Sequence, residues 1–173
     1  MTFSVPETLL TKRLKLRQFR VADWDSMARY YADEVITRYP TGKPLSRNES
    51  WRSIACMIGH WQIHGYGPYA LEQAETGALV GVAGFWYPGG WPEPEIKWGL
   101  HREFWGQGYA SEAARSILAA AEEFLPEIRF VSLIHVENRA SIQLALALGA
   151  EFEKEMDFWW GRFGVYRHQS RQQ

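Results

Sequence analysis

A short segment in the second half of the chain combines two glycines with the start of a helix, which suits it to binding an anion. Glycine lets the backbone turn so that several amide N–H groups point to one spot, and the positive end of the helix dipole lies at the same place. We therefore expect backbone binding of a phosphate group. The segment consists of Trp105, Gly106, Gln107, Gly108, Tyr109, Ala110 and Ser111.

Two other glycine-containing phosphate motifs fit this segment poorly. The dinucleotide-binding fingerprint needs Gly or Ala where Ser111 stands, and it belongs to the first strand–helix crossover instead of a connection in mid-chain. The nucleotide P-loop needs a lysine followed by Ser or Thr, and no lysine occurs between Lys97 and Lys154. The spacing therefore favours neither a dinucleotide site nor a P-loop site.

Hydrophobic periodicity and turn residues predict the elements that hold this segment in place. Apolar residues at helical spacing predict a helix over 110–125, which Pro126 ends. Ser46 and Glu49 form a capping box for an earlier helix that ends at Gly65. The other predicted elements are helices from 22–25 onward and over 138–148, strands over 14–17, 69–72, 79–86, 95–101 and 130–136, a loop over 88–94, and a closing hairpin over 151–168.

The order of these elements mixes antiparallel hairpins with strand–helix–strand crossovers. It reads as one strand, two helices, three strands, a helix, a strand, a helix and two strands. We predict an α/β fold, a three-layer sandwich built on a mixed sheet. A length of 173 residues fits one domain with one core.

Composition excludes several classes of partner. Nineteen basic against twenty acidic residues give a formal charge of -1, which offers no basic surface for nucleic acid. Cys56 is the only cysteine, and no apolar run suits a signal peptide or the roughly 20-residue span of a bilayer. His60 and His64 have a metal-clamp spacing but lack the intervening Glu of a metalloprotease motif. We expect a soluble cytoplasmic protein without metal, nucleic-acid or membrane partners.

Two motifs, in order and spacing, resemble those of the GNAT acyltransferases, in the branch that includes the ribosomal-protein alanine acetylases. The segments 95–100 and 104–113 resemble the family's cofactor strand, loop and helix, and 136–141 with 148–151 resemble its second motif. The match covers most of the chain. It implies a GNAT-like α/β/α sandwich with a mostly antiparallel sheet, and a single N-acetyltransferase domain over 1–173. It also implies acetyl-CoA as co-substrate, with no metal.

The resemblance also implies how coenzyme A is held. Backbone amides of Gly106, Gln107, Gly108, Tyr109, Ala110 and Ser111 would bind the pyrophosphate. Backbone groups of Trp98, Gly99 and Leu100 would pair with the pantetheine arm as with another strand. Asn138 is expected to cap its helix, and its amide either bonds the arm as well or only caps.

Acyl transfer to an amine needs a neutral amine and a stabilised departing sulfur. Glu95 is the candidate base, acting directly or through one water; its alternatives are a solvated strand-end charge and a substrate-binding anion. Ser141 is the candidate hydrogen-bond donor to the sulfur, or else only a helix-end hydrogen bond. Ala145 stands where many family members carry a Tyr that protonates the thiolate, and Trp105 where many carry Arg or Gln.

An aromatic and acidic cluster near the cofactor strand would suit a cationic amine. The candidate acceptors are a protein N-terminus, a polyamine and an aminoglycoside, and a second copy of the chain is a candidate partner. Two non-enzymatic alternatives are an acyl-CoA-binding module, suggested by Ala145, and an interaction protein with exposed tryptophans. The cluster consists of Trp86, Tyr87, Trp91, Glu93 and Glu95, and His135 or Ile134 is expected to face inward nearby.

Overall fold

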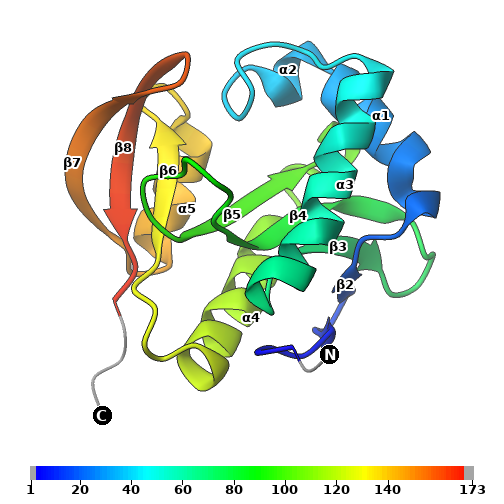
Figure 1. The fold of residues 1–173 in the computed structure, drawn as a ribbon, viewed down its shortest axis with the longest axis horizontal. Coiled ribbons are helices and arrows are strands. Elements are labelled where there is room, and N and C mark those ends of the chain that lie inside the picture. The colour runs from blue at the N-terminus through cyan, green and yellow to red at the C-terminus, as the bar shows by residue number, and fades with distance from the viewer. Residues whose placement is uncertain (1–2, 170–173) are drawn as a thin grey trace.

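A computed structural model describes residues 3–169 as one eight-stranded sheet with helices on both faces (Figure 1). The sheet order is β1-β2-β3-β4-β5-β6-β8-β7. The strands are β1 (Thr8–Leu10), β2 (Leu14–Gln18), β3 (Pro68–Gln73), β4 (Leu79–Trp86), β5 (Glu95–Leu100), β6 (Val131–His135), β7 (Glu151–Phe158) and β8 (Gly161–Arg167). The helices are α1 (Trp24–Ala32), α2 (Glu34–Thr37), α3 (Arg47–His64), α4 (Tyr109–Phe124) and α5 (Arg139–Ala147).

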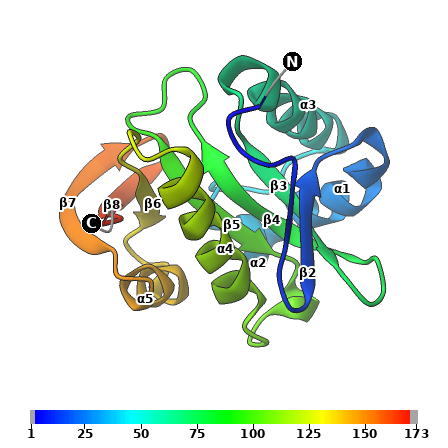
Figure 2. The same cartoon turned by 90° about the horizontal axis from the view of Figure 1, so that it is seen from below.

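The helices lie in two layers, with α1 and α3 on one face of the sheet and α4 and α5 on the other (Figure 2). Strand alternation divides the buried side chains between these layers. Ala70 and Val82 pack with α1 and α3, whereas Leu71 and Ala83 pack in the cluster that holds Ile117 of α4. The three-layer α/β prediction with a mixed, mostly antiparallel sheet is confirmed.

The predicted helix ends agree with the structure where the sequence carries a capping signal. The Ser46 hydroxyl accepts from the Glu49 amide, Glu49 bonds back to the Ser46 amide, and Gly65 ends α3 with a left-handed φ of 75°. Asn138 caps α5 by accepting from the Ser141 amide. These caps fix where α3 and α5 begin.

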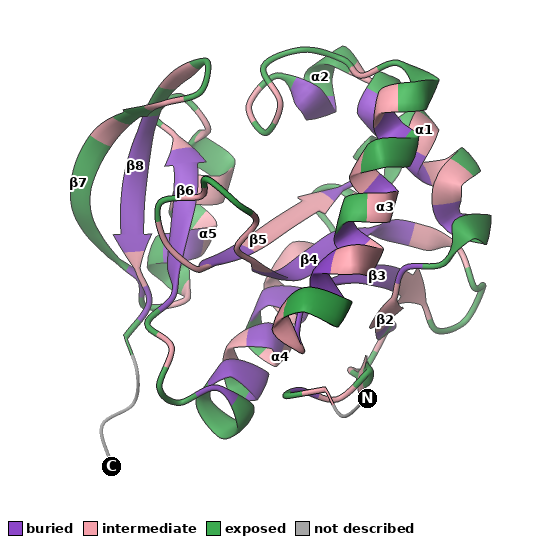
Figure 3. Ribbon diagram, in the orientation of Figure 1, coloured by how far each residue is buried: buried purple, intermediate pink, exposed green. Residues whose placement is uncertain are grey.

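Several short elements were not predicted, among them β1 and α2. Strand β1 has three residues and pairs antiparallel with β2, and α2 has four residues capped by Asp33. Neither is long enough to show a period of hydrophobic residues. The closing hairpin is as predicted, and Figure 3 shows β8 largely buried while the edge strand β7 is largely exposed.

The sheet splits between β5 and β6. Within residues 3–169 these two strands form the only parallel pair, and their register contains a single pair, Glu95 with Val131. Strand β5 pairs with β4 along its whole length, and β6 does the same with β8. Side chains replace the missing backbone pairs, because the Ser132 hydroxyl donates to the Ile96 carbonyl at 2.6 Å and the Leu133 amide donates to the Glu95 carboxylate at 3.2 Å. The strands therefore diverge around a cavity.

None of the helices in the described part of the chain is both long and apolar enough to cross a bilayer.

Candidate active site

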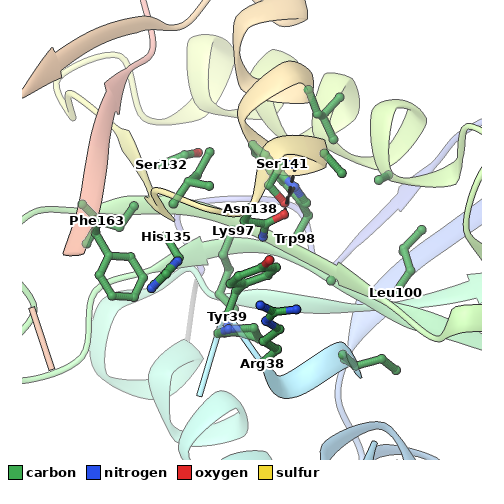
Figure 4. Close-up of a pocket in the computed structure, with 18 of the residues that line it drawn as sticks. Arg38, Tyr39, Lys97, Trp98, Leu100, Ser132, His135, Asn138, Ser141 and Phe163 are labelled. Atoms are coloured by element: carbon green, nitrogen blue, oxygen red, sulfur yellow. Dashed lines mark hydrogen bonds between the residues drawn. The ribbon is translucent and has the colours of Figure 1, made fainter. Parts of the chain in front are cut away.

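A cavity of about 620 Å³ fills the space where β5 and β6 diverge. Its walls come from β5, β6, the starts of α4 and α5, the segment after α2, and the tip of the β7–β8 hairpin. Figure 4 shows Ser141 and Asn138 on one side of β5 and Arg38 and Tyr39 on the other. The cavity thus passes over the edge of β5 from one helical layer to the other.

The open edge of β5 presents the backbone of Trp98. The backbone N–H and C=O of one strand residue face the same neighbour, and successive residues alternate. The Ile96 carbonyl accepts from Ser132, and the Leu100 carbonyl accepts from the indole of Trp105 at 2.9 Å, so both face away from β4. Trp98 lies two residues from each of them, so its backbone N–H and C=O also face away from β4. An extended ligand in the cavity therefore meets the backbone groups of Trp98 between two occupied carbonyls.

Gly99 has the opposite parity, so its backbone groups face β4, where it pairs with Val82. Its lack of a side chain matters instead, because a Cβ at Gly99 would overlap the hydroxyl of Tyr30 from α1. The prediction grouped Trp98, Gly99 and Leu100 as three equivalent backbone partners. The structure brings all three to the cavity but gives them different surroundings.

The glycine segment forms a tight turn before α4. Gly106 and Gly108 have φ of 70° and 81°, in the left-handed region that favours glycine, and Gly108 is the N-cap of α4. Gly106 and Ala110 line the cavity. The first amides of α4, which lack intrahelical partners, belong to this segment. Gln107, Tyr109 and Ser111 are the other residues whose amides were predicted to bind the pyrophosphate, and they alternate with Gly106, Gly108 and Ala110 along this segment.

An arginine from the other end of the chain braces this turn. The Arg13 guanidinium donates to the Gln107 carbonyl at 2.8 Å and to Glu112 at 2.7 Å, and lies 4.2 Å from the centre of the Tyr109 ring. Burial acts to raise the pKa of Glu112, but hydrogen bonds from Thr11 and Arg13 hold it below its usual value. Sequence reasoning missed this brace, because nothing local links residues 94 to 99 positions apart.

Glu95 lies at the base of the cavity and is only 6% exposed. One carboxylate oxygen accepts from the indole of Trp91 at 2.8 Å, and the other accepts from the Leu133 amide. Burial raises the pKa of Glu95 to about 7, against the opposing effects of Lys97 and these two hydrogen bonds. Glu95 is therefore not a solvated strand-end charge, and its carboxylate can exchange a proton near neutral pH.

Ser141 and Asn138 lie at the start of α5, on the α4 side of β5. The Ser141 hydroxyl accepts from the Trp98 indole at 3.3 Å, and its amide donates to the Asn138 side chain at 3.3 Å. Both residues line the cavity. Ala145 is fully buried and packs near Ile134, Ala150 and Tyr166. Ser141 is therefore the hydroxyl that α5 offers to the cavity.

The predicted acceptor cluster is only partly right, because Trp91 and Glu95 line the cavity but the other members do not. Glu93 forms an ion pair with Arg167 at 2.8 Å. Tyr87 lies beside His64, and Trp86 stacks on His60. Both ring nitrogens of His60 already bond to the backbone, at the Tyr66 carbonyl and the Tyr87 amide. Glu93, Tyr87 and Trp86 therefore contact other protein groups outside the cavity lining.

An aromatic wall takes the place of the other members, and the sequence predicted only two of its residues, Trp91 and His135, near the acceptor. Its rings come from segments far apart in the chain. His135 and Ile134 both line the cavity, although they neighbour each other in β6. The wall consists of Tyr39, Trp91, His135, Phe158, Trp160 and Phe163.

A family model of the acetyltransferase (GNAT) domain matches residues 13–151. The uncharacterized N-acetyltransferase p20 of Bacillus licheniformis is 30% identical over 151 residues, which cover 86% of this chain and 84% of that protein. The crystal structure of the acetyltransferase from Agrobacterium tumefaciens C58 is similar with a TM-score of 0.86 and 29% identity, covering 98% of this chain and 97% of that one.

A third similarity concerns the fold alone. RimL, a ribosomal L7/L12 α-N-protein acetyltransferase solved in complex with coenzyme A, has a TM-score of 0.75 and 19% identity, covering 95% of this chain and 96% of that one. The split between β5 and β6, the glycine turn before α4 and the family match all indicate the same acetyltransferase domain. The chain therefore belongs to the GNAT family, and it is an acyl-CoA-dependent acetyltransferase, not either of the non-enzymatic alternatives.

Proposed function

We propose that this protein transfers the acetyl group of acetyl-CoA to the nitrogen of a primary amine, either a protein N-terminus or a small molecule. The observation that carries the proposal is Glu95, a buried carboxylate with a pKa raised to about 7 at the point where the two strands separate. An ammonium must lose a proton before its nitrogen can attack a carbonyl carbon. Glu95 is positioned to take that proton, directly or through one water.

The residues of the donor side fit coenzyme A. When bound, the co-substrate supplies an activated thioester carbonyl. The amides of the turn 106–111 would hold its pyrophosphate at the start of α4, and the Trp98 backbone would pair with the pantetheine arm. Asn138 lines the same side of the cavity, and its amide nitrogen is available in addition to the capping oxygen.

The proton and the leaving group are handled on opposite sides of β5. Glu95 takes one proton from the ammonium before attack. As the N–C bond then forms and the C–S bond breaks, the second proton leaves the nitrogen for water, and the sulfur departs as a thiolate. Ser141 lines the donor side and would donate a hydrogen bond to the departing sulfur, because a hydroxyl is too weak an acid for full transfer to a thiolate. Ser141→Ala should lower kcat about 10-fold and leave CoA affinity unchanged.

The test is an acceptor screen with acetyl-CoA and detection of free thiol. The amines tested are a peptide N-terminus, a polyamine, an aminoglycoside, aromatic monoamines and amino acids. Turnover on an amine, with product acetylated on nitrogen by mass spectrometry, is expected. Tight CoA binding without thiol release on any amine would overturn the proposal.

A further inference from the structure

We propose that the acceptor is a small molecule that carries three features: a primary amine, a carboxylate, and a flat apolar body. The inference rests on the proposed function and narrows its acceptor. Glu95 would take the amine, Lys97 would bind the carboxylate, and the aromatic wall would hold the apolar body.

Lys97 supplies a cation without an anionic partner in the protein. Within residues 3–169 no carboxylate oxygen lies within 4.0 Å of its ammonium nitrogen, which lies 4.4 Å from the centre of the Trp86 ring. Lys97 lines the cavity, and Figure 4 shows it leaving β5 on the side of Tyr39 and Arg38. Burial lowers the pKa of Lys97, while Glu95 opposes that effect. An ammonium in such surroundings gains most from a bound anion.

Glu95 and Lys97 lie two residues apart on one strand, so their side chains leave the same face at a spacing of roughly 7 Å. One side chain carries the candidate base and the other a cation. A molecule with an amine and a carboxylate a few bonds apart can engage both side chains at once. An amine without an anionic group would instead bring its positive charge next to Lys97 without compensation.

The aromatic wall specifies the rest of the acceptor. His135 packs between Tyr39 at 5.2 Å and Phe163 at 5.4 Å between ring centres, and Phe163 contacts Trp160 at 5.5 Å. Trp91 holds Glu95 by a hydrogen bond and contacts Phe158 at 5.0 Å. Flat rings placed this way favour an aromatic or similarly flat apolar group.

The cavity is also bridged on this side. Trp160, at the tip of the β7–β8 hairpin, packs directly on Gly42 in the loop before α3, where an added Cβ would lie 2.6 Å from the indole. Figure 1 shows the hairpin tip and this loop facing each other from the two halves of the molecule. The contact between Trp160 and Gly42 narrows the approach on this side, which favours a small molecule over the N-terminus of a folded protein.

The charges disfavour a polycation. The carboxylates that line the cavity, in the described residues, are Glu95 and Glu137, and Glu137 lies 3.6 Å from Arg38. The lining also includes Lys97 and Arg139. A polyamine or an aminoglycoside needs several carboxylates to balance its charges, and this cavity provides one beyond the Arg38 pair.

The experiment compares phenylalanine with phenylethylamine, which lacks only the carboxylate, and with alanine, which lacks only the ring. Spermidine and an alanine-initiated peptide complete the panel. We expect kcat/KM for phenylalanine to exceed that of each of the others at least 10-fold. Lys97→Met should remove the advantage of phenylalanine over phenylethylamine, and Lys97→Arg should retain most of it. Lys154→Met, on the exposed edge strand β7, is the matched control and should change neither substrate.

Binding to the CoA-saturated protein, followed by tryptophan fluorescence, separates this inference from the proposed function. If phenylalanine binds more tightly than phenylethylamine but no acceptor releases thiol, the function is wrong and the ligand class stands. If thiol is released but phenylethylamine, spermidine or the peptide matches phenylalanine, the inference is wrong and the function stands. An equal loss for both aromatic amines in Lys97→Met, with an unchanged melting temperature, would also overturn it.

Discussion

The donor and acceptor sides of the cavity are built in different ways. The donor side comes mainly from one continuous stretch, the strand β5, the glycine turn and the first turn of α4, and it offers backbone groups. The acceptor side comes from side chains of the segment after α2, the loop before β5, β5 itself, β6 and the β7–β8 hairpin, most of which are distant in sequence. A backbone site can be recognised from a local motif, whereas a side-chain site depends on which distant segments meet.

This difference explains what the sequence could predict. The glycine turn, the capped helices and the order of most elements carry local signals, since φ angles, caps and periodicity act over a few residues. Glu93 shows the opposite case, because its neighbours in sequence suggested an acceptor carboxylate but Arg167 neutralises it from β8. Trp160 meeting Gly42 depends on how the hairpin and the loop are placed, and no local pattern indicates that contact.

The largest expected effect is a loss of turnover caused by a change on the acceptor side, with CoA binding on the donor side unchanged. Glu95→Gln keeps the shape but cannot accept a proton, so kcat should fall about 100- to 1000-fold. Steady-state kinetics measure the loss, and calorimetry should show unchanged CoA affinity.

The pH profile sharpens this test. With a pKa of about 7, Glu95 is the proton acceptor only when ionised, so the wild-type rate should rise as pH increases through 7. Glu95→Gln should lose that rise. A variant that keeps the wild-type profile would show that another group is the base.

The converse change tests the donor side. Gly108→Val places a β-branched residue at φ of 81° at the N-cap of α4, so the turn must rearrange and CoA affinity should fall roughly 100-fold. Gly77→Val is the matched control, because Gly77 has a similar φ of 73° in a turn with open space around it. Both variants should lose stability, but only Gly108→Val should lose CoA affinity by calorimetry. Equal affinities in the two would refute the pyrophosphate assignment.

The donor side also depends on one residue that is distant in sequence, Arg13. It comes from the segment before β2 and holds both the Gln107 carbonyl and Glu112. Arg13→Met should leave the turn less ordered and weaken CoA binding about 10-fold, since the lost contacts involve a charged pair and a carbonyl. Arg52→Met, at an exposed position of α3, serves as the control. If both variants bind CoA like wild type, the turn holds its shape without the brace.

The smallest expected effect concerns stability. It tests whether burying the ionised Glu95 carboxylate on the acceptor side lowers the free energy of unfolding. The folded-state pKa of Glu95 is raised above that of an unfolded glutamate, so folding favours its protonated form. Its contribution to stability is thus present below about pH 4.5 and is lost as pH rises through 7. The amide side chain in the Glu95→Gln variant does not titrate. The melting temperature of the variant minus that of wild type should therefore increase by a few degrees from pH 5 to pH 8. Melting curves at several pH values measure the difference. A constant difference between the two proteins would mean that Glu95 keeps the same charge over this range, and the acceptor side would then need another group to take the proton of the amine.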